Sequence, residues 1–81
     1  MSRIEKLVTR FQAIPSDFTW DELVRLLKSF GYRESKGTGS RRKFRGEGLP
    51  AINLHAPHPD KIVKQYVLRQ VKESLEHEGL L

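Results

Sequence analysis

The segment from Tyr32 to His58 limits the fold more than any other part of the chain, because its side chains alternate with the two-residue period of a β-strand. Arg41, Lys43 and Arg45 fall on one face of such a strand, and Phe44 falls on the other. A strand with this pattern has one packed face and one wet, cationic face.

The apolar segment that follows repeats the alternation. Ile52 and Leu54 share one face, which leaves Asn53 and His55 on the wet face. Glycines and a proline between the runs supply turn residues, at Lys36–Gly39 and again over residues 45–50. We therefore predict a three-stranded antiparallel sheet.

The charge of the chain is concentrated in this sheet. Residues 33–45 contain six basic residues and one acidic residue, which accounts for the whole formal net charge of +5. A patch this localised is what an anionic polymer meets first. Arg42 interrupts the pattern because it falls in the core-facing phase beside Phe44, so we expect it to lie near the strand end or to extend its charged group to solvent.

The length and composition set further limits. A chain of 81 residues predicts a single domain, residues 1–81, with one small core. Cysteine is absent, so neither a disulfide nor a thiolate metal site is available. No apolar run is long enough for a membrane span or a signal peptide. We therefore expect a soluble, cytoplasmic protein that does not bind a membrane.

Two amphipathic helices are predicted before the sheet. Residues 2–13 form an accessory helix that covers an edge of the core, with apolar residues at helical spacing at Ile4, Leu7, Val8 and Phe11. The second helix begins with a capping box from Thr19 to Glu22 and ends at Gly31. Its apolar positions are Leu23, Leu26, Leu27 and Phe30.

A loop and a third helix follow the sheet. Pro57 and Pro59 restrict the loop, which can therefore hold His58 in one place. Helical spacing resumes at about Lys64 and ends at Gly79. The order α-α-β-β-β-α predicts an α+β fold with the helices on one side of the sheet. Without its first helix, this order is that of the double-stranded RNA-binding domain. The expected core residues are Leu26, Leu27, Phe44, Ile52, Leu54 and Val71.

Several short motifs, taken in order, resemble the HicA toxins of bacterial HicAB toxin–antitoxin modules. They are Leu26-Leu27-Lys28-Ser29-Phe30-Gly31-Tyr32, Lys36–Ser40 leading into Arg41–Phe44, Ile52–Pro59, Tyr66–Val71 and Glu78-Gly79-Leu80. The resemblance covers residues 19–81 and leaves the accessory helix outside. It implies a double-stranded-RNA-binding-like fold and cleavage of mRNA without a metal or cofactor. It also implies neutralisation by a HicB-like antitoxin that covers the active surface.

The resemblance also implies a catalytic residue that this chain lacks. The family's usual pattern is Gly-Ser-His at the start of the second strand, whereas here Gly39 and Ser40 are followed by Arg41. Attack by a 2′-hydroxyl needs a group that exchanges a proton near neutral pH, which an imidazole does and a guanidinium does not. We expect Arg41 to stabilise negative charge at phosphorus, and His55 and His58 to be the candidate proton-transfer residues. The expected RNA-binding residues are Lys36, Ser40, Arg41, Lys43 and Arg45.

Two functions from different classes fit these features. One is a HicA-like, RNA-binding toxin, with or without cleavage of mRNA. The other is a non-catalytic interaction module whose basic sheet docks an acidic protein partner. No metal site is expected, because His55, His58 and Asp60 offer no clear ligand geometry. The glycines of Lys36–Gly39 lack the spacing of a nucleotide-binding loop.

Overall fold

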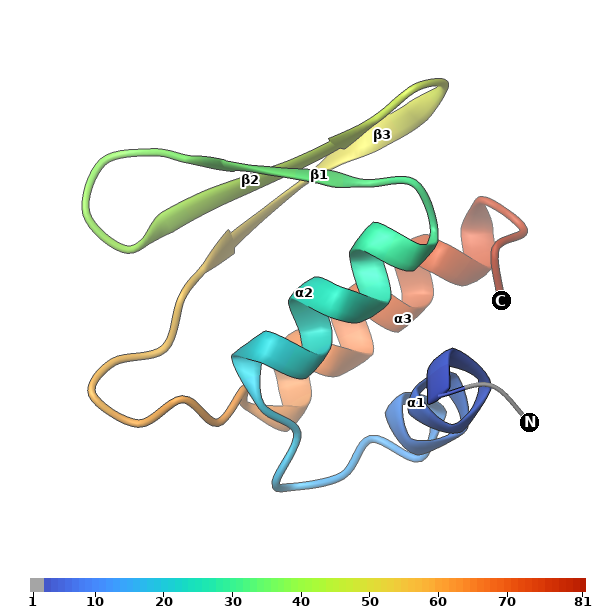
Figure 1. Ribbon diagram of the computed structural model, residues 1–81, viewed down its shortest axis with the longest axis horizontal. Helices are drawn as coiled ribbons and strands as arrows, with labels where there is room; N and C mark the ends of the chain where they lie inside the picture. The colour runs from blue at the N-terminus through green and yellow to red at the C-terminus, as the bar shows by residue number, and fades with distance from the viewer. Residues whose placement is uncertain (1–2) are drawn as a thin grey trace.

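The secondary structure follows the order α-α-β-β-β-α in the computed structural model, which describes residues 3–81 (Figure 1). The helices are α1 (Arg3–Gln12), α2 (Trp20–Ser29) and α3 (Gln65–His77), and the strands are β1 (Arg33–Lys36), β2 (Arg41–Gly46) and β3 (Leu49–His55). The predicted α+β class and the double-stranded-RNA-binding-like order are confirmed. Ser2, the predicted start of the first helix, lies outside the described residues.

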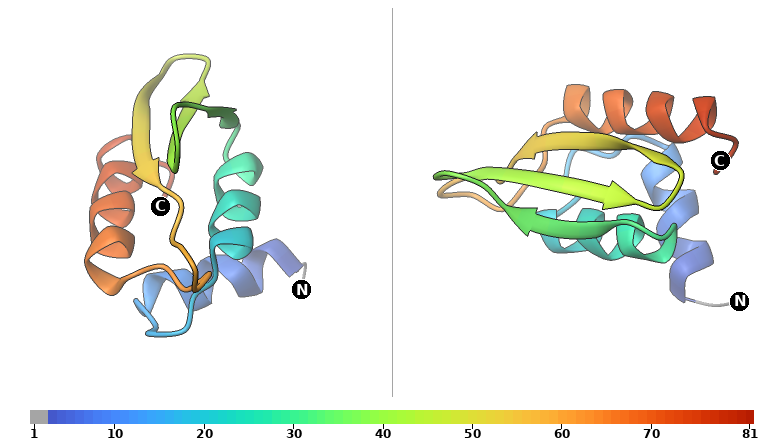
Figure 2. Two further views of the ribbon diagram at one scale, coloured as in Figure 1. Left: turned by 90° about the vertical axis from the view of Figure 1, so that its left-hand side faces the viewer. Right: turned by 90° about the horizontal axis from the view of Figure 1, so that it is seen from above.

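The sheet has the order β1-β2-β3 with both pairings antiparallel. Helices α2 and α3 lie side by side against one face of the sheet, and α1 crosses on the far side of this helix pair (Figures 1 and 2). Over residues 3–81, the other face of the sheet is not covered by any helix (Figure 2). No helix within residues 3–81 is long and apolar enough to cross a membrane.

The connection between β2 and β3 is shorter than the turn predicted for residues 45–50. Strand β3 begins at Leu49, two residues before the predicted Ala51. Gly48 has a φ of 71°, a conformation that glycine adopts without the strain that a Cβ atom would cause, and this permits a tight turn. A register shift between Phe44 and Gly46 absorbs the extra residue of β3.

The core lies between the sheet and the helices. All six predicted core residues are buried, at 8% exposure or less. The side chain of Trp20, in the first turn of α2, reaches the sheet, since its ring centroid is 5.9 Å from that of Phe44. Leu80 and Leu81, beyond the end of α3, also pack against this cluster. The apolar faces predicted from the helix and strand periods are therefore the faces that meet.

Helix α1 covers the side of the core that faces away from the sheet. Leu7 and Phe11 are its buried residues. Arg10 fixes the helix to α2, because its guanidinium contacts Glu22 at 3.0 Å and Asp17 at 2.8 Å and lies 5.2 Å from the ring centroid of Phe18. In the structure α1 thus packs on the core through Leu7 and Phe11, and the basic side chain of Arg10 serves to hold the helix in place.

The start of α2 also anchors the proline-containing loop. The Thr19 hydroxyl accepts a hydrogen bond from the Glu22 amide at 3.2 Å, and the Glu22 carboxylate accepts one from the Thr19 amide at 2.9 Å, which confirms the capping box. Backbone hydrogen bonds of 2.8 Å then join Trp20 to Lys61 and Val63 to Phe18. The loop between β3 and α3 is thereby held against the start of α2.

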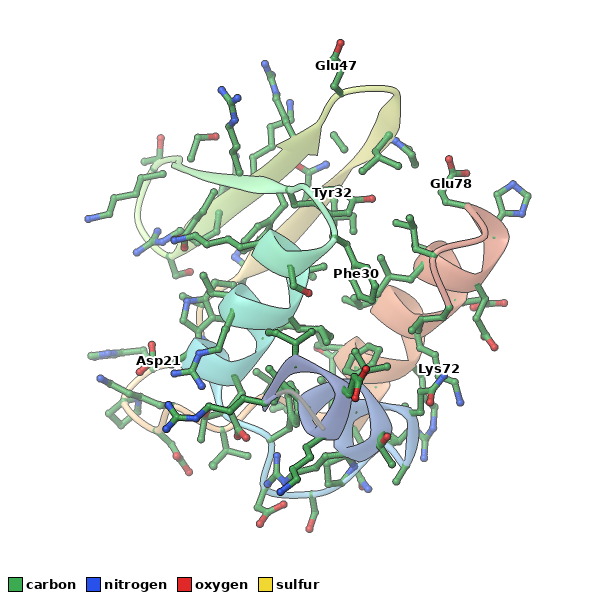
Figure 3. The ribbon with its side chains drawn as sticks, turned by 45° about the vertical axis from the view of Figure 1, so that its right-hand side comes forward. Asp21, Phe30, Tyr32, Glu47, Lys72 and Glu78 are labelled. Carbon is green, nitrogen blue, oxygen red and sulfur yellow. The ribbon has the colours of Figure 1, made fainter. Side chains whose placement is uncertain are left out.

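Tyr32, which precedes β1, is buried where α2 meets the sheet. Its hydroxyl donates to the carbonyl oxygen of Pro50 at 3.4 Å. Burial raises the pKa of this hydroxyl above its ordinary value of 10.0, and repulsion from the Glu78 carboxylate raises it further. Figure 3 labels both residues, Tyr32 beside the sheet and Glu78 at the end of α3.

Candidate nucleic-acid interface

The face of the sheet that no helix of residues 3–81 covers carries four of the six lysine and arginine side chains of the strands. Residues paired across an antiparallel sheet project from the same face. By this rule the uncovered face is formed by Arg33 and Ser35 of β1, Arg41, Lys43 and Arg45 of β2, and Asn53 and His55 of β3. We call these residues the basic face. Figure 3 shows nitrogen-tipped side chains projecting from this side of the sheet.

The predicted alternation along β2 is confirmed. Arg41 and Arg45 are exposed, whereas Phe44 between them is fully buried. Lys43 is half-buried, because β2 is the central strand and Ser35 and Asn53 flank it on both sides. The wet face that the sequence predicted is therefore present, with its most central cation partly covered by neighbours.

The cations of the basic face have no acidic neighbour on that face. Within residues 3–81, Arg33, Arg41, Lys43 and Arg45 form no salt bridge and no side-chain hydrogen bond. An unneutralised cluster of this kind produces a positive potential that attracts anions.

Arg42, on the opposite face of the same strand, is held differently. Its Nε lies 3.8 Å from the Glu34 carboxylate, and its Nη1 donates to the carbonyl oxygens of Gly39 and Arg41 at 3.0 and 2.8 Å. The expectation that Arg42 lies near the strand end is confirmed, because it is the second residue of β2. Among the described residues, the cation that faces the core side is paired, whereas the cations of the basic face form no ion pair.

One pair on the basic face lowers the stability of the sheet. Arg33 lies directly across from Arg45, and like charges in this arrangement are destabilising. Both side chains are exposed, so solvent and salt reduce the cost to a few tenths of a kcal/mol. The Arg33 and Arg45 pair is therefore not explained by a contribution to the stability of the sheet.

At the other end of the basic face, a serine, an arginine and a histidine come together. Arg41 lies directly across from His55, and the Ser40 Oγ is 3.3 Å from the His55 Nδ1. A backbone hydrogen bond of 2.8 Å from the Ala56 amide to the Ser40 carbonyl fixes the two strand ends. The contact through Nδ1 leaves the Nε2 atom of the exposed His55 ring for a ligand. We call Ser40, Arg41 and His55 the histidine corner.

A groove begins at the histidine corner and runs to the first turns of α3. It has a volume of about 540 Å³ and is lined by the end of β3, the proline-containing loop and one side of α3. His55 and His58 both line it. His58 is exposed and forms no hydrogen bond through its side chain within residues 3–81, in contrast to His55. No group of three histidine, aspartate or glutamate side chains in the described part of the chain is arranged to hold a metal ion.

The part of the chain that carries the sheet and the histidine corner matches a known protein family. The family described as HicA toxin of bacterial toxin–antitoxin matches residues 20–79, from the start of α2 to just beyond the end of α3. This match extends over well more than half of the chain. The chain belongs to the HicA toxin family. Neither the curated proteins nor the solved structures gave a match.

The HicA match excludes α1 and includes both the basic face and the histidine corner. The family pattern implied a histidine where this chain has Arg41, and the register places His55 directly across from that position. Cα atoms of directly paired residues are about 4.5–5.5 Å apart. An imidazole is therefore present at the corner, on β3 in place of β2.

The predicted site residues are only partly brought together. Ser40, Arg41, Lys43, Arg45 and His55 are joined on the basic face or its corner, and His58 is joined to His55 through the groove. Lys36 is separate, because it pairs with Arg42 and so projects from the opposite face at the end of β1.

Three residues of the basic face, Arg33, Ser35 and Asn53, were not among the predicted site residues, and Ser35 lies there through its pairing with Lys43. Arg33 joins it through its pairing with Arg45, and Asn53 joins it through its pairing with Lys43. The strand period predicted that Asn53 lies on the outer face, so this polar residue could have been identified as a site residue from the sequence. The face of Arg33 depends on the register between β1 and β2, which the sequence pattern did not specify.

Proposed function

We propose that this protein is a HicA-type toxin that binds single-stranded RNA on its basic face and cleaves mRNA without a metal ion. The observation that carries the proposal is the histidine corner, where an exposed imidazole lies between Ser40 and Arg41 at the end of an unneutralised cationic face. The protein would act in the cytoplasm, where mRNA is translated.

In the proposed reaction, the 2′-hydroxyl of one nucleotide attacks the adjacent phosphorus atom. The new 2′-O–P bond forms, the P–O5′ bond breaks, and the products are a 2′,3′-cyclic phosphate and a 5′-hydroxyl. His55 accepts the 2′-hydroxyl proton at Nε2, in the tautomer whose Nδ1–H donates to the Ser40 Oγ. The protonated imidazole then returns the proton to the leaving 5′-oxygen.

Arg41 has the second role. As a permanent cation across the strand from His55, it stabilises the negative charge that develops on the phosphate oxygens. His58 lies on the groove without a hydrogen bond that would orient its ring within residues 3–81, so His55 is proposed as the principal proton-transfer residue.

The test is cleavage of a single-stranded RNA oligonucleotide in EDTA, with analysis of the product ends. We expect cyclic or 3′-phosphate ends. His55→Ala should lower the rate about 10²–10⁴-fold, the usual contribution of a general acid–base residue. His58→Ala, the matched control on the same groove, should lower it less than about tenfold on the same scale. Unchanged cleavage in the double variant would exclude both imidazoles, and binding without any cleavage by the parent would identify an RNA-binding relative of the toxins.

Arg41 is tested with two variants. Arg41→Gln should lower the cleavage rate about 10²–10³-fold, as removal of one transition-state donor does in other enzymes. Compared with Arg41→Gln at the same pH, Arg41→His should cleave faster, and its advantage should grow as the pH falls, because an imidazole carries charge mainly below its ordinary pKa of about 6.5. A rate above that of the parent at neutral pH would instead mean that the parent lacks a working proton-transfer group.

An acidic, HicB-like antitoxin is the proposed protein partner. A negatively charged surface would be drawn to the same unpaired cations and would cover the histidine corner. Expression in a bacterium, with growth and bulk mRNA integrity followed, distinguishes a toxin from a protein-docking module. Arrested growth with intact mRNA would contradict the proposed cleavage.

A further inference from the structure

Tyr66 is the one large hydrophobic residue within residues 3–81 that is exposed, with 57% of its surface accessible. It lies in the first turn of α3, and its hydroxyl has no hydrogen-bond partner among the described residues. A single exposed aromatic residue is ordinary on a protein surface. The position of Tyr66 is informative, because it lines the same groove as His55.

The groove has the composition of a site for a flat, partly polar group. Leu54, Pro57 and Val67 supply apolar surface, and the side-chain amides of Asn53 and Gln70 supply donors and acceptors. A nucleobase has this character, with an apolar ring face for stacking and a polar edge for hydrogen bonds.

The charges around the groove also suit a nucleotide. Lys64 lines it as an exposed cation. The one acidic residue of the lining, Asp60, accepts a hydrogen bond from the Ile62 amide at 3.2 Å. Asn53 and His55 line the groove and also belong to the basic face, so the two sites adjoin.

We propose that this groove binds one base of the RNA, stacked on the ring of Tyr66, next to the scissile phosphate at the histidine corner. The inference rests on the proposed RNA binding and deepens it by assigning a base subsite beside the scissile bond. In this arrangement the basic face holds phosphates, and Tyr66 holds a base.

The two kinds of contact differ in their response to salt. A phosphate contact releases counterions and contributes to the salt dependence of binding, whereas a stacking contact does not. Tyr66→Ala should therefore weaken binding about 5- to 150-fold without changing the slope of log K against log salt. Tyr66→Phe keeps the ring and should bind within about twofold of the parent.

The experiment measures fluorescence anisotropy with a short single-stranded 2′-O-methyl oligoribonucleotide, which lacks the attacking hydroxyl and cannot be cleaved. A second oligonucleotide of the same length has abasic sites throughout. We expect Tyr66→Ala to weaken binding of the first and to leave binding of the second unchanged. Circular dichroism checks that Tyr66→Ala is folded. We expect that it is, because the side chain of Tyr66 is exposed.

Each other outcome overturns the inference in a distinct way. If the parent binds with strong salt dependence and Tyr66→Ala binds equally well, the stacking subsite is wrong and the proposed RNA binding stands. A change in the salt slope would assign Tyr66 to a phosphate contact. Weaker capture of an acidic protein with unchanged oligonucleotide binding would assign the groove to a protein. Absence of binding by the parent would refute the proposed function and the inference with it.

Discussion

Reversing the charge of two residues on the basic face should separate RNA binding from stability. Lys43→Glu with Arg45→Glu changes only side chains on the uncovered face, with Phe44 between them left in the core. If the basic face binds phosphates, the double variant should lose RNA binding and remain folded. If RNA instead binds away from β2, the same change would have no effect on RNA binding.

The magnitude follows from the number of free cations. Arg33, Arg41, Lys43 and Arg45 give four phosphate contacts, so log K against log salt should have a slope of about −3 on a single strand. Raising the salt from about 0.05 to 0.2 M then weakens binding about 50-fold. A neutral variant, Lys43→Gln with Arg45→Gln, keeps two contacts, with a slope of about −1.4 and a loss of about sevenfold over the same range. The charge reversal places two carboxylates beside the two remaining cations and should abolish binding.

Stability should move in the opposite direction. Arg33 faces Arg45 in the parent and would face a carboxylate in the reversed variant. A destabilising like-charge pair becomes an opposite-charge pair, so the free energy of unfolding should stay equal or rise by a few tenths of a kcal/mol. The gain should shrink as salt is added, because the pair is exposed.

The assays are anisotropy with labelled RNA over a salt series and urea unfolding at the same salt concentrations. Arg25→Glu with Arg69→Glu is the matched control, since it makes the same change in net charge at exposed positions of α2 and α3. The control should keep most of the parent slope. Binding that survives the reversal on the sheet, or an equal loss in the control, would refute the assignment of the basic face. Loss of stability in the reversed variant would contradict the arrangement of the Arg33 and Arg45 pair.

Three further predictions concern the scaffold. Leu54→Ala removes a side chain that is 8% exposed and should lower the free energy of unfolding, measured in urea, by about 2–5 kcal/mol. Asn53→Ala, on the outer face, should change it by less than about 0.5 kcal/mol. Equal effects of the two changes would mean that the strand phase is wrong. Thr19→Ala should cost about 1 kcal/mol through loss of the capping box, and Thr19→Ser should restore most of it. The raised pKa of Tyr32 favours its protonated form in the folded state, so this stabilisation is complete below about pH 10 and is lost as the pH rises through the folded-state pKa. The melting temperature should therefore fall less above pH 10 in Tyr32→Phe than in the parent, and parallel curves would argue against a raised pKa.

Much of the fold could be predicted because the local signals agree with the packing. The capping box from Thr19 to Glu22 marks where α2 begins, and the helical stripes and the strand alternation indicate which side of each element is apolar. Leu54 and Phe44 are examples, because each was assigned to the core by period alone and each is buried. Where one face of a strand is clearly apolar, only one assignment of its residues to the two faces buries the apolar side chains.

What the sequence did not specify was the relation between elements. The register that pairs Arg33 with Arg45 depends on the length of the β1–β2 turn, and the same register places Lys36 on the opposite face. The groove depends on contacts between the proline-containing loop and the start of α2, which are backbone hydrogen bonds and leave no side-chain pattern. The Ser40–His55 contact likewise joins residues fifteen positions apart through strand pairing.

The division of the sheet into two faces explains how so small a protein tolerates an unpaired cationic surface. The stabilising burial is on the helix side, where the apolar residues of α1, α2, α3 and the strands form one cluster. The basic face adds repulsion between Arg33 and Arg45 and has no acid of its own to offset it. A bound polyanion would remove this repulsion, so relief of the repulsion would add to the favourable free energy of binding that its contacts supply. If the proposed RNA and the proposed acidic antitoxin both contact these cations, they would compete for the histidine corner.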